Sequence, residues 1–418
     1  MNTAYKNEID NKILVSCFIA GCLEMYDFLL FGFLAPIIHA NYLSFLTQSM
    51  GITVTYLLFA VGFLFRPLGS LIFGYIGDVY GRKKAVVLSV SFMGIASLAL
   101  ALIPSYDTVG VLSCWLIVIA RIIQGISVGG EYSGVTIYAI EHTDGKKIGI
   151  IGSIVLAGGV LGVLIATAVS KIVQNPAFPE YSWRLAFLLG FSLSLIGYFI
   201  RKRLNESPLF TAKETKKDKV PLMHGLKFYK RQFISSVFLA GANNANFYFI
   251  LIFIPRYLKI NAPNSAGFDT LLLTIIMLFL LPIIGWFSDR VGRLKILFLV
   301  GSFFVIYQQL LLPSLVNSVS LLLSYFHVAV CAIFIAAYVS TTNIFVLEIF
   351  PTSCRFSCGA VSYSIGTALI GGTAPFVCSY IIENFGTDPI NLAYYMSFIS
   401  ILGFIGCLLM RQAKPRHI

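Results

Sequence analysis

The sequence predicts an all-α membrane protein whose transmembrane helices, about twelve in number, form two six-helix bundles, and three observations support this fold class. First, 58% of the 418 residues are hydrophobic and only 11% are charged, whereas a soluble domain carries about 25% charged residues. Second, the apolar residues form runs of about 20 residues, the length that crosses a bilayer as a helix. Third, one charged turn occurs twice, which indicates an internally repeated architecture.

The predicted helices fall into two sets of six, separated by a polar connector at 204–232. The N-terminal bundle, 1–203, contains spans near 13–39, 52–77, 84–104, 109–140, 148–174 and 184–203. The C-terminal bundle, 233–418, contains spans near 233–258, 269–288, 295–313, 319–347, 357–383 and 391–410. The connector is short and highly charged, so we interpret it as a solvated tether; a regulatory segment is the alternative.

The repeated turn follows the second span and again the eighth span. Its two copies share the pattern Gly-x-x-x-Asp-x-x-Gly-Arg, and all four positions are shifted by the same 211 residues. The first copy consists of Gly74, Asp78, Gly81 and Arg82, and the second of Gly285, Asp289, Gly292 and Arg293. Glycine permits close approach and positive φ, and the aspartate can accept from a helix N-terminus. One copy would be typical of an ordinary turn, but two copies favour a transporter built from repeats.

The loop charges predict the topology. The connector and its flanks, 201–232, carry ten basic residues against three acidic ones, and further cations occur at 82–84, 146–147, 293–295 and 411–416. The opposite loops contribute little beyond Lys171, Arg256 and Lys259. Because basic loops stay in the cytoplasm, we expect both termini and the connector to be cytoplasmic. The first apolar run is too long for a signal-peptide core, so it is predicted to be retained as a span.

The composition disfavours several other classes of protein. The net charge of +12 is concentrated in loops, and no basic patch interleaved with aromatic residues suggests nucleic-acid binding. The eight cysteines are scattered in apolar runs and are typical of buried free thiols. Cys354 and Cys358 are four residues apart but have no His or further Cys nearby, so no metal site is predicted. No Ser/His pair, HExxH motif or phosphate-binding loop indicates an enzyme, and no cofactor is expected.

Several charged side chains are predicted at membrane depth, where each costs about 2.5–3.5 kcal/mol on insertion scales. They include Glu24 and Asp27 in the first span, Arg66 in the second, and Arg121 and Glu131 in the fourth. Glu24 and Asp27 share one helix face, and two nearby carboxylates disfavour double ionisation, so one of them can hold a proton. We therefore assign proton coupling to Glu24, Asp27 and Arg121. A static ion-pair network with Arg66 or Arg121 is the alternative.

Other polar residues are assigned to substrate binding. Asn243 and Asn244 in the seventh span precede an aromatic run, which suits a cavity for a small polar solute, although hydrogen bonding between helices explains them equally well. Tyr26, Arg121 and Glu131 are assigned to the same cavity, with helix packing as the alternative for Glu131.

A third group is assigned to gating. Arg66 lies just before the first repeated turn. Glu141 and Glu348 end the fourth and tenth spans, where we expect them to pair with Arg82 or Arg293 in a latch. The two turns contribute the remaining latch residues, Asp78, Gly81, Asp289, Arg290 and Gly292.

Segments along nearly the whole chain resemble the major facilitator superfamily, and more narrowly its metabolite:proton symporter branch, which includes proline/betaine, citrate, 2-oxoglutarate and shikimate carriers. The matching segments are 24–28 (Glu-Met-Tyr-Asp-Phe), 65–69 (Phe-Arg-Pro-Leu-Gly), 77–83, 124–132 with its Ser-Val-Gly-Gly-Glu-Tyr run, 183–184, 206–208 (Glu-Ser-Pro), 288–293 and 350–355. The Ser-Val-Gly-Gly-Glu-Tyr run is specific to the branch, and the two turns identify the superfamily. One departure is Val79, which replaces the basic residue usual after the loop aspartate; Arg290 keeps that residue in the second copy.

The resemblance implies a carrier with a midplane site between two bundles and alternating access driven by proton uptake. It implies that Arg121 is the fourth-helix arginine linked to proton coupling, and that Asp78 and Arg82 belong to the cytoplasmic latch. We expect a monomeric symporter that imports a small organic acid or zwitterion across a bacterial cytoplasmic membrane, with the substrate, protons and membrane lipid as partners. The alternatives are a proton-independent facilitator, an exporter of the same fold, or a transporter-like metabolite receptor.

Overall fold

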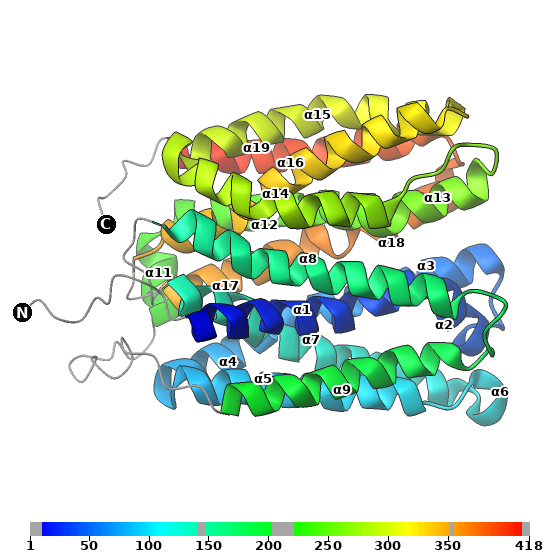
Figure 1. The fold of residues 1–418 in the computed structure, drawn as a ribbon, viewed down its shortest axis with the longest axis horizontal. Helices are drawn as coiled ribbons and strands as arrows, with labels where there is room; N and C mark the ends of the chain where they lie inside the picture. Colours follow the sequence, from blue (N-terminus) through cyan, green and yellow to red (C-terminus); the bar gives the residue numbers. More distant parts are fainter. Residues whose placement is uncertain (1–10, 141–146, 203–220, 352–354, 412–418) are drawn as a thin grey trace, which may run out of the picture. The chain divides into compact units, whose positions relative to one another are not determined.

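The structure is a computed structural model that describes residues 11–140, 147–202, 221–351 and 355–411, and in these ranges it contains helices and turns but no strand (Figure 1). Among the described residues, 12 helices are long and apolar enough to cross a membrane. The number and the apolar length of these helices confirm the predicted all-α architecture with two sets of six spans. The observed spans overlap all of the predicted ranges.

The first six spans are α1 (Asn11–Phe33), α3 (Gln48–Leu64) continued by α4 (Arg66–Val79), α5 (Arg82–Leu102), α7 (Val111–Ile140), α8 (Ile148–Val173) and α9 (Ser182–Lys202). The last six are α12 (Lys230–Tyr248) continued by η1 (Phe249–Phe253) and α13 (Ile254–Asn261), α14 (Thr270–Val291), α15 (Arg293–Asn317), α16 (Leu321–Glu348), α17 (Arg355–Gly366) continued by η2 (Thr367–Gly371) and α18 (Ala374–Phe385), and α19 (Pro389–Arg411). Three short helices are α2 (Ala35–Tyr42), α6 (Tyr106–Val109) and α11 (Pro221–Phe228).

Three spans are interrupted, and a proline follows each interruption. Pro67, Pro255 and Pro375 each occupy the first turn of the helix that resumes the span, namely α4, α13 and α18. Proline has no N–H to donate and its ring crowds the preceding turn, so the helix re-forms around it with a wider or broken turn. In the seventh span the π-helical turn η1 follows directly after the asparagine-rich segment of α12.

The helices group into two compact units, one of residues 1–145 and 154–214 and the other of residues 146–153 and 215–418. These units resemble the two predicted bundles, except that the first turns of α8 group with the second unit. Within the predicted connector, residues 221–228 form α11. Leu222 of α11 packs against Phe350 and Cys358, so this part of the connector belongs to the second unit.

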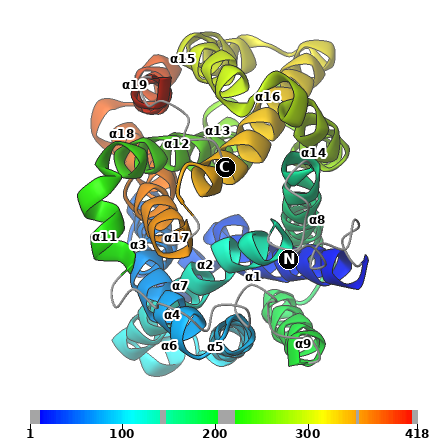
Figure 2. The ribbon, with the colours of Figure 1, turned by 90° about the vertical axis from the view of Figure 1, so that its left-hand side faces the viewer.

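In the first unit, α5 lies beside α9, and α7 lies beside α3, α4 and α5 (Figure 2). Glycines bring α8 against α1: a Cβ added at Gly158 would overlap the carbonyl oxygen of Phe18, and one added at Gly162 would overlap that of Cys22. A Gly-x-x-x-Gly face therefore allows the two helix backbones to touch.

In the second unit, α19 lies beside α12 and α15, and α14 lies beside α16 (Figure 2). α17 approaches α12 closely, because a Cβ added at Gly366 would overlap the carbonyl oxygen of Val237. Aromatic rings also pack between α15 and α16: Phe303 and Phe334 stack with their ring centroids 3.5 Å apart.

The two repeated turns have the backbone that the sequence predicted. Gly81 has φ of 110° and Gly292 has φ of 94°, and these glycines precede α5 and α15. Side chains other than glycine rarely adopt this left-handed region. The glycine pattern is therefore explained by the backbone of the turn.

Candidate functional site

The two carboxylates of α1 are both buried but have different partners. Glu24 is 2% exposed, and its Oε1 lies 3.5 Å from Nη2 of Arg66, the first residue of α4. The guanidinium of Arg66 is also 5.6 Å from the ring centroid of Phe28 and 5.5 Å from that of Phe63. Glu24 therefore lies beside a cation that balances its charge.

Asp27 belongs to a chain of hydrogen bonds that crosses three helices. Its Oδ2 accepts a short hydrogen bond from the hydroxyl of Ser97 on α5. Ser97 accepts from Nε2 of Gln124 at 3.4 Å, and Oε1 of Gln124 accepts from Nη1 of Arg121 at 2.7 Å, both on α7. All four residues, which we call the Asp27 chain, are 0% exposed. A buried carboxylate and a buried guanidinium are thus connected through two neutral side chains.

Arg121 is held by α3 and by aromatic rings as well as by Gln124. Its Nη2 donates to the carbonyl oxygen of Phe59 at 3.2 Å, and its guanidinium lies 4.6 Å and 4.5 Å from the ring centroids of Phe28 and Phe31. Gly62 gives it room, because a Cβ added there would lie 2.6 Å from Nη2. Cation–π contacts and carbonyl oxygens stabilise this charge at depth.

The substrate-binding assignments in the first unit have other surroundings. The hydroxyl of Tyr26 donates to the carbonyl oxygen of Ala186 at 2.8 Å, and Tyr26 is 0% exposed, so it connects α1 to α9. The side chain of Glu131 lies outside the described residues.

The asparagines of α12 face different neighbours. Nδ2 of Asn244 donates to the carbonyl oxygen of Ala240, to the hydroxyl of Tyr363 and to the hydroxyl of Thr367, at 2.8–3.1 Å. In contrast, Oδ1 of Asn243 is buried and accepts no hydrogen bond from any described residue. Asn244 therefore ties α12 to α17 and η2, while Asn243 keeps a free acceptor that a ligand can use.

A second amide network lies in the same unit. Nε2 of Gln308 on α15 donates to Oδ1 of Asn246 at 2.6 Å, and Nδ2 of Asn246 lies 3.3 Å from the hydroxyl of Ser400 on α19. All three residues are 0% exposed. Neither Gln308 nor Ser400 was predicted from the sequence, because the pair Gln308 and Gln309 and the single Ser400 are uncharged residues in apolar runs and match no motif.

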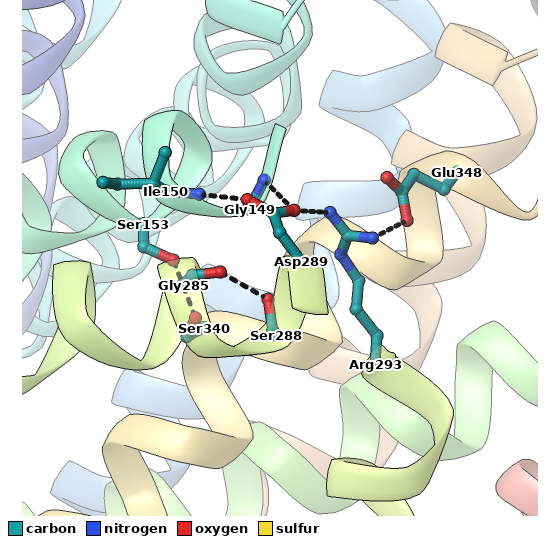
Figure 3. Close-up of polar contacts among 9 residues, drawn as sticks. All are labelled: Gly149, Ile150, Ser153, Gly285, Ser288, Asp289, Arg293, Ser340 and Glu348. Atoms are coloured by element: carbon teal, nitrogen blue, oxygen red, sulfur yellow. Dashed lines mark hydrogen bonds and ion pairs between the residues drawn. The ribbon is translucent and has the colours of Figure 1, made fainter. Parts of the chain in front are cut away.

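The second repeated turn caps the start of another helix (Figure 3). Asp289, near the end of α14, accepts from the backbone N–H groups of Gly149 at 2.8 Å and Ile150 at 3.1 Å, in the first turn of α8. Nη2 of Arg293 lies 2.7 Å from Oδ1 of Asp289, and its Nη1 lies 2.9 Å from Oε2 of Glu348. The structure thus brings together three of the assigned latch residues, which we call the Asp289 cluster.

Close backbone packing supports the Asp289 cluster (Figure 3). A Cβ added at Gly285 would lie 2.5 Å from the carbonyl oxygen of Gly149, so α14 and the start of α8 touch there. One turn further along α8, Ser153 shares a hydrogen bond with Ser340 of α16, with 2.7 Å between the oxygens. The aspartate cap therefore sits on a contact that requires small residues.

The other residues assigned to gating lie at several separate places in the fold. Arg290 does not join the Asp289 cluster; its guanidinium lies 3.7 Å from the ring centroid of Trp286. Gly81 and Gly292 form the turns, and Arg66 pairs with Glu24. The side chains of Asp78 and Arg82, and all of Glu141, lie outside the described residues. Within the described part of the chain, no group of three His, Cys, Asp or Glu side chains could hold a metal ion.

Comparisons with known proteins agree with this architecture. The sequence model of the Major Facilitator Superfamily matches residues 17–355. The proline/betaine transporter of Escherichia coli K12 is 30% identical over 427 residues, which cover 97% of this chain and 84% of the relative. The proline/betaine transporter of Salmonella typhimurium LT2 is similar to the same extent.

Solved structures show the same fold. The proton:xylose symporter XylE bound to 6-bromo-6-deoxy-D-glucose matches with a TM-score of 0.75 at 17% identity, over 97% of this chain and 96% of that one. A partially occluded inward-open conformation of XylE from E. coli matches with a TM-score of 0.74 at 16% identity, over 97% of this chain and 98% of that one.

Proposed function

Since this chain belongs to the Major Facilitator Superfamily and is a transporter rather than an enzyme, we propose that it is a proton-coupled symporter that imports a small organic acid or zwitterion by alternating access. It acts as a monomer in a bacterial cytoplasmic membrane, with both termini in the cytoplasm and the two bundles, 1–203 and 233–418, as its moving parts. The observation that carries the proposal is the Asp27 chain, which connects a buried carboxylate to a buried guanidinium.

Asp27, rather than Glu24, is the proton carrier in this proposal. Glu24 has Arg66 beside it at 3.5 Å, which favours a permanently ionised carboxylate. Asp27 accepts instead from the neutral hydroxyl of Ser97. A hydroxyl can donate to a carboxylate or accept from a carboxylic acid, so this contact can persist whether or not Asp27 carries the proton.

Protonation of Asp27 changes the charge of the chain. With Asp27 ionised, its negative charge balances the positive charge of Arg121; with Asp27 protonated, Arg121 retains an excess positive charge. A substrate carboxylate then supplies the balancing charge, because opposite charges interact strongly where water is excluded. In this way proton binding and binding of an acidic or zwitterionic substrate favour each other, which is the requirement for symport.

The second unit contributes a group that orients the solute. The free Oδ1 of Asn243 can accept from a hydroxyl or ammonium group of the substrate. The relatives named for proline and betaine support a zwitterion with one carboxylate, and the citrate, 2-oxoglutarate and shikimate carriers of the resemblance support organic acids.

The Asp289 cluster acts as the cytoplasmic latch in this proposal. An aspartate at a helix N-terminus and an arginine between two carboxylates are charge-assisted contacts that can break and re-form as a unit. Glycine packing at Gly149 and Gly285 allows the helices to separate without disturbing larger side chains.

Uptake by purified protein in liposomes tests the proposed function. Radiolabelled proline, glycine betaine, citrate, 2-oxoglutarate and shikimate are offered with an inward proton gradient, with the reversed (outward) gradient, without a gradient, and with a protonophore. We expect one of them to accumulate only with the gradient. Equal uptake with and without it would indicate a facilitator, and accumulation only under the reversed gradient would indicate an exporter.

A further inference from the structure

One buried imidazole has no part in the mechanism above. His327 on α16 is 4% exposed and lies between two hydroxyl groups of α15. Its Nδ1 is 2.6 Å from the hydroxyl oxygen of Tyr307, and its Nε2 is 2.9 Å from that of Ser314. Tyr307 and Ser314 are about two helical turns apart, so they lie on one face of α15 and hold both ring nitrogens.

Both partners of the ring are hydroxyl groups, and this decides which protonation states the site can hold. A neutral imidazole has one donor and one acceptor nitrogen, whereas an imidazolium has two donors. A carbonyl or a carboxylate can only accept a hydrogen bond, so such a partner keeps a proton on the ring nitrogen that it contacts. A hydroxyl can donate or accept by rotating, so Tyr307 and Ser314 can satisfy the ring in the neutral state and in the charged state.

We propose that His327 is a second proton-binding site, separate from Asp27: Tyr307 and Ser314 both accept hydrogen bonds from the charged ring, and one of the two hydroxyls reverses to donate when the ring loses its proton. The site makes transport sensitive to the pH on the side of the membrane that it faces. The proposal does not depend on coupling through Asp27, because the two sites lie in different units of the chain.

Within the described part of the chain, no fixed charge that would hold the ring in one state contacts it. Its other neighbours are the ring of Phe326, 5.7 Å away between centroids, and the buried thiol of Cys331, one turn further along α16. The charged residues at this end of the unit are Arg256 and Lys259 on α13, Asp269 at the start of α14, Glu383 near the end of α18, and Asp388 just before α19. Among the described residues, no carboxylate, lysine or arginine contacts the imidazole.

The position of the site suggests the route of the proton. α16 begins at Leu321, so His327 lies about 9 Å from the start of its helix. Ser314 is partly exposed and lies close to Asn317, where α15 ends. The hydroxyl of Ser314 is therefore the group through which a proton reaches Nε2. This end of α15 and α16 is opposite to the Asp289 cluster, and in the orientation proposed above it is the outer end.

Imidazole nitrogen NMR tests the proposal directly. The protein is labelled with ¹⁵N-histidine and reconstituted in nanodiscs, and His327 is assigned as the signal that is lost in His327→Gln. We expect its nitrogens to change from a neutral tautomer to the imidazolium between about pH 8 and about pH 5, the range in which histidine ordinarily titrates. A ring that stays neutral, or stays charged, over this range would overturn the proposal.

Two variants distinguish a proton site from a purely structural contact. Tyr307→Phe removes one hydroxyl and keeps the ring packing, so the NMR midpoint should move while the Tm changes little; an unchanged midpoint would contradict the assigned role of Tyr307. His327→Gln can bond to both hydroxyls but cannot titrate. It should remove one limb of the pH profile of uptake, and a profile identical to the wild type in a folded variant would overturn the pH-sensing role.

Discussion

At the residue scale, the two carboxylates of α1 illustrate how position decides the role of a charge. Glu24 and Asp27 occupy one face of the helix, yet Glu24 meets the guanidinium of Arg66 while Asp27 meets the hydroxyl of Ser97. The sequence grouped them as one pair because it contains their spacing but not their partners. Ser97 is 70 residues from Asp27, so only the packing of α5 against α7, and of α7 against α1, determines which carboxylate belongs to the chain.

Removing the charge of Glu24 should destabilise the protein rather than uncouple it. Glu24→Gln leaves Arg66 buried without its counter-charge, and breaking a buried ion pair typically costs about 3 kcal/mol or more. We expect a lower Tm in detergent, with proton-driven accumulation retained by the folded fraction. Glu24→Gln combined with Arg66→Gln should recover part of the lost stability. A stable Glu24→Gln variant that has lost accumulation would instead transfer the proton role to Glu24.

A methyl group at Gly190 should disturb Asp27 without touching its charge. A Cβ at this position of α9 would overlap Oδ1 of Asp27, so Gly190→Ala must displace the carboxylate. We expect weaker proton coupling, measured as a lower ratio of accumulated to external substrate. Gly301→Ala is the matched control, because its added Cβ would lie 3.8 Å from its nearest neighbours. Equal loss in both variants would show that the effect is not specific to Asp27.

At the element scale, the start of α8 depends on a residue from another helix. Asp289 accepts from two of the first N–H groups of α8, which have no acceptor within their own helix. The repeated turn made Asp289 and its capping role predictable from the sequence. Which helix it caps was not predictable, because Gly149 is 140 residues away and carries no signal except its small size.

Loss of the Asp289 carboxylate should loosen this helix end locally. Asp289→Ala removes both acceptors, and removal of a helix cap typically costs about 1 kcal/mol. We expect faster hydrogen exchange at Gly149 and Ile150, measured by mass spectrometry of peptides that cover residues 147–153.

Asp269→Ala is the matched control for this effect. Asp269 caps α14 through the N–H groups of Leu271 and Leu272, so its loss should accelerate exchange at the start of α14 and leave α8 unchanged. Unchanged exchange in residues 147–153 of Asp289→Ala would show that the cap does not stabilise α8.

At the scale of the whole molecule, the sequence predicted the number and order of the spans better than their internal breaks. Hydropathy reports apolar length, so all twelve spans were found. It does not report local geometry: the seventh span runs from Lys230 to Asn261 through a π-helical turn, and part of the predicted tether folds as α11. The π-helical turn lies just before Pro255, and α11 packs through Leu222 against Phe350 and Cys358. A sliding average of hydropathy contains neither the backbone effect of a proline nor a contact with a distant residue.

The charge distribution makes a topological prediction for the molecule. In a variant without its eight natural cysteines, a cysteine at Ser105 or Asn175 should react with a membrane-impermeant maleimide added to intact cells. A cysteine at Lys227 should react only after the membrane is opened. Labelling of the Lys227 position in intact cells would place the connector outside and contradict the proposed orientation.

The central claim is that a proton on Asp27 accompanies the substrate, and a pH-sensitive dye inside proteoliposomes tests it most directly. With the transported solute from the uptake panel added outside at equal internal and external pH, the wild-type protein should acidify the lumen, and Asp27→Asn should transport by exchange without acidification. Acidification by Asp27→Asn at the wild-type rate, or wild-type uptake with no pH change, would contradict the account.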